Sequence, residues 1–528
     1  MKLNAASLLF VLCALCAIEK TRSAKILALV PFPSFSHQVP FRKLILGLQK
    51  RGHEVVYATT HPIPNVNLKN FTQIDLSRTP AKFNTLNFMQ FRFDGVTWIE
   101  VLEKQVFSAC ESSMENLFNN PEMKRLYAAD SDAKFDVVLA EFSYIPSIYS
   151  MAHRFDAPLI GLSSLGLLNM YEYALGGFVL PSNEYSAEMG ARPGSNLPFW
   201  QRVRNYIVMW RTLYKIFNEW VPRHQKMAEH YLGTKLPPLI DIVKNTSLVF
   251  VNEPEPFTPA RPKLPNMISF TSLHVDENPP PAPKDLQRFM DEAKQGFIYM
   301  SLGGNARSAD IPMDVQQIFF DVFSKLPYRV VWKYEEDFPV KLDNVYAAKW
   351  LPQQSILAHP NIKLFMYQGG LQSTEEAISN TVPVMGFPVL SDQDYITSRV
   401  NALGIGKWLT ITTLTREQLD NTIREVITNK EYKQRITHLK DLIRDTAYNE
   451  VDRLVWWTEY VIRHKGAPHL RSTLVNQPWY QRYDIDVVMF LAIVAFVIVS
   501  TLVYIIARII VRVHRQLLSP TTQKKKIN

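Results

Sequence analysis

The sequence predicts an α/β protein with two doubly wound domains that face each other, followed by a single transmembrane helix. Three observations carry this prediction. A strand–helix–strand pattern begins at residue 24, and the pattern restarts after a proline-rich segment, "NPPPAPK". A run of 21 uncharged residues follows the second pattern. The predicted segments are 1–23 (signal peptide), 24–277 (N-terminal domain), 278–284 (linker), 285–445 (C-terminal domain), 446–486 (helical return and juxtamembrane segment), 487–507 (transmembrane helix) and 508–528 (basic tail).

The first 23 residues have the three parts of a secretory signal peptide. Lys2 supplies a short basic start, an apolar stretch runs from Ala5 to Ile18, and small residues offer a cleavage site near Ser23 or Ala24. The alternative is a permanent N-terminal anchor, but the apolar stretch is too short to span a bilayer. We therefore expect a mature chain that begins near residue 24.

The first domain opens with a βαβ unit. "KILALVPF" (25–32) predicts a buried strand, "QVPFRKLILGLQKRG" (38–52) a helix, and "HEVVYAT" (53–59) the next strand. The unit lacks a G-x-G-x-x-G loop, which argues against a dinucleotide-dependent reductase. "FDVVLAE" (135–141) and "APLIGLSS" (157–164) are further strands, whereas the aromatic-rich residues 170–240 are expected to form loops and helices over a cleft.

The second domain repeats this pattern after the linker. Strands are predicted at 296–304, 328–334, 363–370 and 382–390, and helices at 315–326 and 373–379. One long helix is expected at 441–466. Two doubly wound domains joined by a linker place a ligand cleft between their facing strand ends.

The C-terminus predicts a single-pass type I membrane protein. The apolar run 487–507 is long enough for a transmembrane helix, and Arg508, Arg512 and Arg515 follow it, so the tail is expected in the cytosol and the body in the lumen. The final "KKIN" resembles a dilysine retrieval signal, which predicts the endoplasmic reticulum membrane; the alternative is a merely basic tail.

Charge and cysteine content narrow the function classes. The last 22 residues hold six lysines and arginines and no acid, so much of the net charge of +9 lies outside the body. The body has no electrostatic footprint for nucleic acid. Of the three cysteines, Cys13 and Cys16 lie in the signal peptide, and we interpret Cys110 as a buried structural residue rather than a nucleophile. The sequons at Asn70 and Asn245 are candidate glycosylation sites.

The segment "YQGGLQSTEE" indicates a phosphate site. Gly369 and Gly370 allow a tight turn close to a ligand, and Ser373 or Thr374 is expected to cap the helix that follows. Free N–H groups and the helix dipole favour an anion there. Taken alone, the segment is equally compatible with a plain strand-to-helix turn.

The stretch from Trp350 to Gln393, "WLPQQSILAHPNIKLFMYQGGLQSTEEAISNTVPVMGFPVLSDQ", resembles the signature of the UDP-glycosyltransferase family. The likeness extends over nearly the whole chain, and the "QGGLQST" variant resembles the insect branch. The resemblance implies a GT-B-like fold of two Rossmann-like domains, with the acceptor in the N-terminal half and the UDP-sugar in the C-terminal half. It implies UDP-sugar as co-substrate, small lipophilic acceptors, no prosthetic group and no metal. A homo-oligomer is left open.

The resemblance assigns UDP-sugar contacts residue by residue. Trp350 is expected to stack on uracil, Gln353 to bind near uracil and ribose, and Glu376 to accept from ribose hydroxyls. Asp392 and Gln393 are expected to take sugar hydroxyls. The phosphate neighbourhood is expected to contain Ser301, Gly303, Gly304, Gln368, Gly370, Gln372 and Ser373. Without the signature, Trp350 reads as a core residue, Gln353 as a surface amide and Glu376 as a helix-start acid.

The catalytic base is expected in the N-terminal half. His37 is expected on the loop after the first strand, and its imidazole would take the proton of an acceptor hydroxyl in a single displacement with inversion. Glu141, at the end of another strand, would orient His37. Arg261, in "RPKLPN", is a more speculative contact to the diphosphate.

Three residues depart from the family pattern. Gln368 stands where the family usually has His, Glu141 where it has Asp, and Gly304 where Ser is common. The leading hypothesis is transfer of a hexose, with glucose as the sugar that the resemblance to the insect branch implies and with a role in detoxification. The alternative is a catalytically inactive relative that sequesters small hydrophobic ligands.

Overall fold

The computed structural model describes residues 23–77, 82–179 and 197–518. The predicted signal peptide lies outside the described residues except for Ser23, and the terminal KKIN lies outside them as well. The chain forms two compact units, one up to Ser472 and one from Thr473 onward.

The first half of the larger unit is built on a parallel sheet. Among the described residues it has seven strands in the order β3-β2-β1-β4-β5-β6-β7. These are β1 (Lys25–Val30), β2 (Glu54–Thr59), β3 (Phe71–Asp75), β4 (Val137–Glu141), β5 (Leu159–Ser163), β6 (Leu248–Asn252) and β7 (Met267–Phe270). The winding direction reverses between β1 and β4, which pair in parallel, so a ligand crevice is expected beyond their carboxyl ends.

The second half repeats the plan with a smaller parallel sheet. Its described strands run in the order β10-β9-β8-β11-β12-β13. They are β8 (Phe297–Ser301), β9 (Arg329–Lys333), β10 (Val345–Ala348), β11 (Ile362–Tyr367), β12 (Val384–Gly386) and β13 (Gly406–Trp408). Here the reversal falls between β8 and β11. The prediction of two doubly wound domains is confirmed, although the sequence did not reveal β3, β6, β7, β10 and β13.

Both faces of the first sheet are buried, as parallel strands require. Along β1, Ile26 and Ala28 belong to one apolar cluster and Leu27 and Leu29 to another, the alternation that strand geometry imposes. The cluster that contains Leu27 continues into the second half, where it includes Trp332 and extends to Tyr432. The two halves therefore share packed side chains in addition to the connecting chain.

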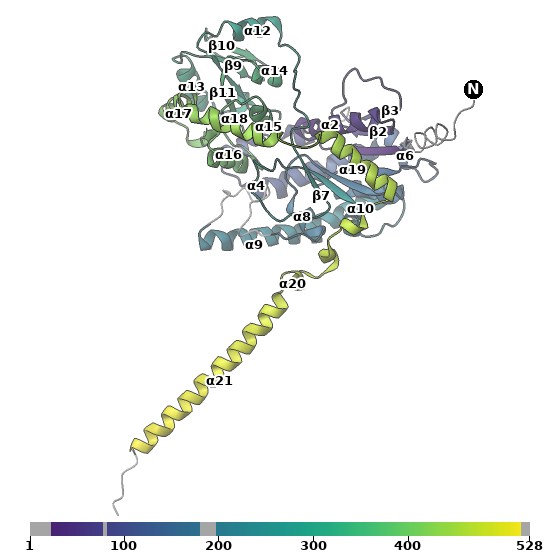
Figure 1. The fold of residues 1–528 in the computed structure, drawn as a ribbon, viewed down its shortest axis with the longest axis vertical. Coiled ribbons are helices and arrows are strands. Elements are labelled where there is room, and N and C mark those ends of the chain that lie inside the picture. Colours follow the sequence, from purple (N-terminus) through teal and green to yellow (C-terminus); the bar gives the residue numbers. More distant parts are fainter. Residues whose placement is uncertain (1–22, 78–81, 180–196, 519–528) are drawn as a thin grey trace, which may run out of the picture. The chain divides into compact units, whose positions relative to one another are not determined.

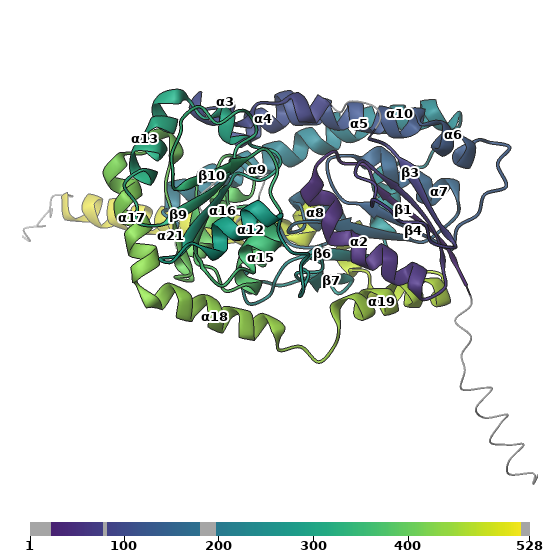
Figure 2. The ribbon, with the colours of Figure 1, turned by 90° about the horizontal axis from the view of Figure 1, so that it is seen from above.

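Helices cover both sheets (Figures 1 and 2). Those of the first half are α2 (Phe35–Lys50), α3 (Phe88–Phe93), α4 (Trp98–Val101), α5 (Phe107–Asn119), α6 (Pro121–Tyr127), α7 (Ser150–Arg154), α8 (Asn169–Ala174), α9 (Phe199–Lys215), α10 (Val221–Leu232) and α11 (Leu239–Lys244). Those of the second half are α12 (Lys284–Asp291), α13 (Met313–Phe323), α14 (Gln353–Leu357), α15 (Leu371–Ser379), α16 (Gln393–Ala402), α17 (Arg416–Thr428) and α18 (Lys430–Arg444). Short 3₁₀ turns are η1 (Lys82–Thr85), η3 (Pro146–Tyr149), η6 (Ser308–Asp310), η7 (Ile411–Thr413), η8 (Pro468–Leu470) and η9 (Thr473–Asn476), and π turns are η2 (Leu102–Val106) and η5 (Ile216–Trp220).

Several predicted boundaries were wrong. The first helix begins at Phe35 rather than Gln38, because Ser34 is the extended N-cap (φ −124°, ψ 131°), and Pro40 lies inside the helix beyond its first turn. The strand predicted at 382–390 ends at Gly386. The long helix predicted at 441–466 is two helices, α18 and α19 (Glu450–His464), and Asn449 caps the second through its side chain.

Helix α19 returns to the first half, where it packs on α2 (Figure 2). A Cβ atom added at Gly47 of α2 would lie 2.8 Å from Val451 Cγ1, so glycine sets the closeness of the two helices. Glu459 of α19 accepts two hydrogen bonds from Arg51, each 3.1 Å long. The chain end of the larger unit is thus fixed to the beginning of its first half.

The proline-rich segment is held in place rather than free. Asp276 pairs with Lys43 at 2.9 Å, and its N–H donates to Gln354 Oε1. Pro280 O accepts from Ser355 Oγ at 2.6 Å. Helix α12 begins at Lys284, the last residue of the predicted linker.

The smaller unit contains α20 (Trp479–Arg482) and α21 (Ile485–Leu518). Among the described residues, α21 is the one helix long and apolar enough to cross a membrane. It contains the predicted span 487–507 and continues into the basic residues after it. Its 34 residues correspond to roughly 50 Å, which exceeds the ~30 Å hydrocarbon core.

Candidate active site

A cavity of about 430 Å³ lies where the two halves meet, and residues of both halves line it. The loops beyond β1 and β4 approach it from the first half, and those beyond β8 and β11 from the second. Each sheet therefore presents its topological switch point to the cavity, the place where doubly wound sheets bind ligands.

The cavity brings together the UDP-sugar contacts expected from the resemblance. Its lining includes Ser301, Gly303, Gly304, Trp350, Gln353, Gln368, Gly370, Gln372, Ser373, Glu376, Asp392 and Gln393. His37 lines it from the opposite half. We call the lining from the second half the donor wall, and the lining from the first half the acceptor wall.

His37 and Glu141 form a pair at the acceptor wall. His37 Nδ1 donates to Glu141 Oε1 over 2.6 Å, although the two residues are 104 positions apart. They meet because β1 and β4 are adjacent and end side by side. The expectation that His37 lies on a loop was wrong, because it is in the first turn of α2.

The pair is fixed by its surroundings. Glu141 is 1% exposed, and its Oε2 accepts from the N–H of Phe32 at 3.1 Å. The His37 ring stacks on Phe32 with ring centroids 4.3 Å apart. With Nδ1 bonded to a carboxylate, Nε2 is the nitrogen left to accept a proton. The arrangement suits a general base.

Trp350 is a surface of the cavity rather than part of the core. Its side chain is 67% exposed, and its ring meets Phe35 of α2 edge-on at 6.1 Å. Lys333, at the end of β9, places its ammonium 5.7 Å from the ring centroid and donates to Gly303 O at 2.7 Å. A flat, exposed indole face can stack on a planar base.

Sequence reasoning missed Lys333. The signal was present, because a charged residue at the carboxyl end of a buried strand is the same pattern that identified Glu141. Among the described residues that line the cavity, His37 and Lys333 are the two with basic side chains.

Glu376 is the centre of a polar network on the donor wall. Its Oε2 accepts from Gln353 Nε2 at 2.7 Å and its Oε1 from Gln354 Nε2 at 3.0 Å. Gln353 Nε2 also lies 2.9 Å from Ser373 Oγ. Three predicted contacts, Gln353, Ser373 and Glu376, are thus oriented by one another.

A second buried network supports Glu376 from behind. His274 Nε2 lies 3.4 Å from Glu376 Oε1, and its Nδ1 lies 3.8 Å from Glu375 Oε2. Burial acts to lower the pKa of His274, but the two carboxylates outweigh it and the pKa is raised. Burial raises the pKa of Glu375, and the nearby His274 opposes that rise. Since Glu375 also accepts from Asn252 of β6 at 2.9 Å, the network joins both halves.

The glycine turn differs from expectation in its cap. Gly370 (φ −68°, ψ 141°) is the N-cap of α15, with no side-chain cap, and Thr374 Oγ1 donates back to Gly370 O. The prediction of a Ser373 or Thr374 cap was therefore wrong. Gly369 adopts φ 92°, and a Cβ there would lie 2.5 Å from Thr397 Cγ2, so this glycine is required.

The three departures from the family pattern occupy different settings. Gln368 has a buried Oε1 without a hydrogen-bond partner. Its Nε2 lies 2.4 Å from the position that a Cβ atom on Gly303 would take. Gly304 has open space at the position of a Cβ. Glu141 has one methylene more than the family's usual Asp and still forms the hydrogen bond with His37.

Asp392 and Gln393 begin α16 at the end of the cavity. Gln393 Oε1 accepts from the N–H groups of Val389 and Leu390 at 2.9 and 3.0 Å, which fixes the loop before it. Burial raises the pKa of Asp392 to about 6, and the charge of His37 across the cleft acts in the opposite direction. A charge on His37 of the acceptor wall therefore influences the pKa of Asp392 on the donor wall.

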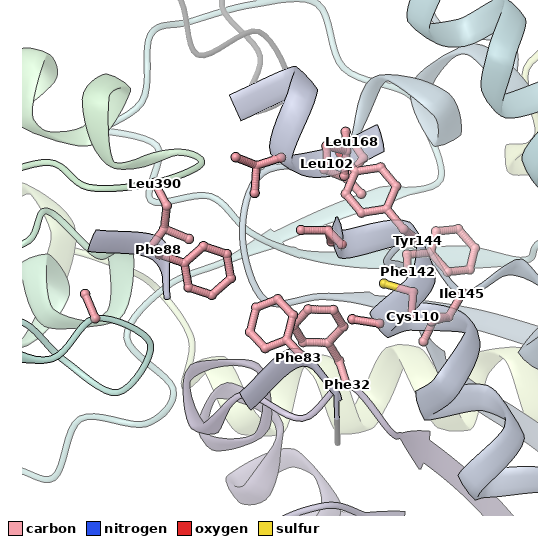
Figure 3. Close-up of a cluster of buried hydrophobic side chains, with 14 of the residues drawn as sticks. Phe32, Phe83, Phe88, Leu102, Cys110, Phe142, Tyr144, Ile145, Leu168 and Leu390 are labelled. Atoms are coloured by element: carbon pink, nitrogen blue, oxygen red, sulfur yellow. The ribbon is translucent and has the colours of Figure 1, made fainter. Parts of the chain in front are cut away.

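The acceptor wall is apolar and aromatic. Phe32, Phe83, Phe142 and Tyr144 line the cavity together with Leu390 of the second half, and Figure 3 shows Leu390 next to Phe88 and across from Tyr144. Phe32 and Phe83 pack edge-on at 4.8 Å. Apart from His37, Asp276 and several serines, this wall offers a ligand apolar surface.

Contacts across the cleft close it. Ser34 Oγ donates to Asn305 Oδ1 at 3.0 Å. Arg92 of α3 donates to both carboxylate oxygens of Asp394, each at 3.0 Å. The second pair lies two residues from Asp392.

Three predicted site residues lie elsewhere. Arg261 pairs with Glu172 and Glu253 at 3.2 Å and does not line the cavity, so the structure does not bring it to a diphosphate. Asn70 is exposed at the start of β3. Asn245 is exposed, but its Nδ2 donates to Asp241 O and its Oδ1 accepts from Arg471.

The described residues contain no group of three or more His, Cys, Asp or Glu side chains arranged to hold a metal ion. Cys110 is buried, and burial raises the pKa of its thiol well above the usual range.

Comparisons with known proteins agree with this geometry. The family model "UDP-glucoronosyl and UDP-glucosyl transferase" matches residues 24–524. A UDP-glycosyltransferase UGT5 of Dactylopius coccus is 30% identical, covering 92% of this chain and 91% of its own. UDP-glucosyltransferase 2 of the same insect is 31% identical over 90% of this chain and 91% of its own. The structure of Os79 from O. sativa in complex with UDP shares the fold, with a TM-score of 0.56 at 14% identity, over 83% of this chain and 100% of that one.

Proposed function

Because the chain belongs to the UDP-glucoronosyl and UDP-glucosyl transferase family, and is therefore a glycosyltransferase that uses a UDP-sugar, we propose that it transfers glucose to a hydroxyl of small lipophilic acceptors with inversion. The observation that carries this proposal is the His37–Glu141 pair, which lies across the cavity from Asp392.

His37 is the general base of the proposed reaction. The acceptor oxygen attacks the anomeric carbon while its proton moves to His37 Nε2. The bond from that carbon to the diphosphate breaks, and UDP leaves with the bonding electrons. Glu141 accepts the hydrogen bond from Nδ1–H and stabilises the imidazolium that forms.

Different residues of the donor wall would bind the uracil, the ribose and the diphosphate of UDP-glucose. Trp350 stacks on uracil, Gln353 binds near uracil and ribose, and the Glu376 carboxylate accepts from ribose hydroxyls. Gln372, Ser373 and the N–H groups around Gly370 face the diphosphate at the start of α15. Lys333, which donates to Gly303 O and pairs with Glu335 at 2.9 Å, places an ammonium group beside the turn at Gly303, a role for which the sequence proposed Arg261.

The sugar and acceptor are supported by separate observations. A relative that is 31% identical is named a UDP-glucosyltransferase, which favours glucose. The apolar acceptor wall favours lipophilic alcohols and phenols, and such conjugation is detoxification chemistry. We also propose residence in the endoplasmic reticulum membrane, with a cleaved signal peptide, a lumenal body glycosylated at Asn70, and a cytosolic tail.

Transfer assays test the proposal. Membranes containing the protein would receive UDP-glucose, UDP-glucuronic acid or UDP-galactose with a panel of phenols. We expect transfer from UDP-glucose, and we expect His37→Ala to abolish it while UDP binding persists. Full activity of His37→Ala would refute the proposed base. UDP binding without transfer by the unaltered protein would favour the inactive, ligand-sequestering alternative.

A further inference from the structure

Helix α9 has an outer face that is unusual for a helix exposed to water. Its sequence, FWQRVRNYIVMWRTLYK, contains no acid and four basic residues. Asn205, Met209, Thr212 and Leu213 form its buried side. Figure 1 shows the helix at the periphery of the larger unit, and large side chains on its other side are exposed.

The uncovered side is aromatic and aliphatic. Trp200, Ile207 and Tyr214 recur every seven residues, so they lie in one row opposite the buried side. Their exposed fractions are 77%, 59% and 66%. Phe199 and Tyr206, 63% and 48% exposed, widen the row. We call these five residues the α9 outer face.

Basic residues lie along the edge of this face. Arg204 and Arg211 follow Trp200 and Ile207 by four residues, which places them beside the row. Arg211 and Lys215 pair with Glu103 at 3.0 and 2.5 Å. Arg202 and Arg204 make no ion pair with a described residue, so two guanidinium groups remain for an external anion.

We propose that the α9 outer face binds a lipid surface. Tryptophan, tyrosine and arginine together are typical of helices that lie in the membrane–water interface, with apolar side chains buried roughly 5–10 Å and cations at the headgroups. In solution the same five side chains would remain in contact with water. Arg202 and Arg204 match the lipid phosphates in charge.

The chain itself provides the membrane. Helix α21 is long and apolar enough to anchor the protein, so a bilayer is present at high local concentration. Phospholipid contact by α9 would turn a single tether into a two-point attachment. This inference rests on the proposed membrane anchor but not on sugar transfer.

Site-directed spin labelling tests the inference on the full chain in lipid vesicles. The labelled variant is Ile207→Cys and the matched control is Met313→Cys of α13, because both side chains are 59% exposed. The unaltered chain is the blank, since Cys110 is buried. Collision of the label with oxygen, which dissolves in lipid, is compared with collision with a water-soluble nickel chelate.

We expect the Ile207→Cys label to collide mainly with oxygen and the Met313→Cys label mainly with nickel. Mixing phosphatidylserine into phosphatidylcholine vesicles should deepen the Ile207→Cys label, and Arg202→Gln with Arg204→Gln should remove that effect. Equal nickel accessibility at the two positions would overturn the proposal. Shielding from both reagents that grows with protein density would instead identify a second copy as the occupant. A chain without transferase activity yields the same labelling result, so the two proposals fail separately.

Discussion

The donor and acceptor walls of the cavity recognise ligands in different ways. The donor wall is polar and is drawn largely from one stretch, Trp350 to Gln393, whose side chains bond to one another. The acceptor wall is mainly apolar and comes from positions as far apart as Phe32 and Leu168. Hydrogen-bond recognition is therefore encoded locally, whereas the apolar shape exists only after the chain has folded.

Among the predicted substitutions, Glu141→Gln should have the largest effect on activity, because Glu141 holds His37, the proposed base. The amide keeps the size of Glu141 but cannot balance an imidazolium. We expect kcat to fall by about 10²-fold to 10⁴-fold. UDP binding, measured by calorimetry, should be unchanged because no donor-wall contact is lost. Glu141→Asp is the control, and it should retain more activity than the amide. Equal kcat in the glutamine variant and the unaltered enzyme would contradict the pair.

Trp350→Ala should weaken the donor wall alone. Loss of a base stacked on an aromatic ring removes about 1–3 kcal/mol, which corresponds to roughly 5-fold to 150-fold in UDP-sugar affinity. The KM for the acceptor should change little. Because Trp350 is 67% exposed, the fold should tolerate the change. An equal rise in the KM for the UDP-sugar and the KM for the acceptor would show that the two walls do not bind their ligands independently.

Asp392 predicts a pH dependence confined to the sugar. Its pKa of about 6 lies above the ordinary 3.8, so it is largely ionised at pH 7 and largely protonated at pH 5. If the carboxylate accepts from sugar hydroxyls, affinity for UDP-glucose should fall below pH 6, approaching about tenfold per pH unit. Asp392→Asn, which cannot titrate at this position, is the matched control and should show no such fall. The same dependence in Asp392→Asn would contradict the assignment.

The raised pKa of Asp392 also has a consequence for stability. A carboxyl that holds its proton more tightly when folded favours the native state at low pH and loses that contribution as pH rises through about 6. Asp392→Asn should therefore raise the melting temperature at pH 7 relative to the unaltered protein, and the difference should shrink toward pH 4.

Phe83→Ala should disturb the acceptor wall alone. The substitution removes an aromatic contact to Phe32, 4.8 Å away, and leaves room for a bulkier acceptor. We expect the KM for a small phenol to rise by about threefold to tenfold, which corresponds to about 1 kcal/mol of contact. The KM for UDP-glucose should stay constant, as donor titrations at saturating acceptor would check. A higher kcat/KM for a larger acceptor would show that Phe83 limits the size of the acceptor.

Gly304→Ser should have the smallest effect. A Cβ at this position meets open space, so the family's usual serine fits without strain. One added hydrogen bond to the diphosphate contributes about 0.5–1.5 kcal/mol, which predicts a roughly 2-fold to 10-fold lower KM for UDP-glucose. Gly303→Ser is the contrasting control, because a Cβ there would lie 2.4 Å from Gln368 Nε2. An unchanged KM in Gly304→Ser would exclude a phosphate contact at this position.

The sequence predicted the donor wall better than the helix boundaries that frame it. Buried strands ending in Ser301, Tyr367 or Glu141 identified the cavity edges, because hydrophobic runs mark parallel strands clearly. The cap at Gly370 and the placement of His37 in a helix escaped notice, because backbone geometry rather than residue type determines both.

The acceptor wall and the short edge strands could not be predicted. Phe83, Phe142 and Leu168 converge only through tertiary packing, and no spacing in the sequence relates them. Lys333 was overlooked although its position at a strand end was informative. Arg261 was misplaced because one of its carboxylate partners, Glu172, lies far from it in the sequence.

The packing of α19 against α2 affects how the protein is made. Residues 450–464 are translated after both sheets, yet they cover an apolar side of the first half and bind Arg51 through Glu459. A nascent chain that ends before residue 450 leaves Leu44 and Leu48 of α2 without this cover. The first half thus completes its fold last during synthesis, and until then its exposed surface is a target for chaperones.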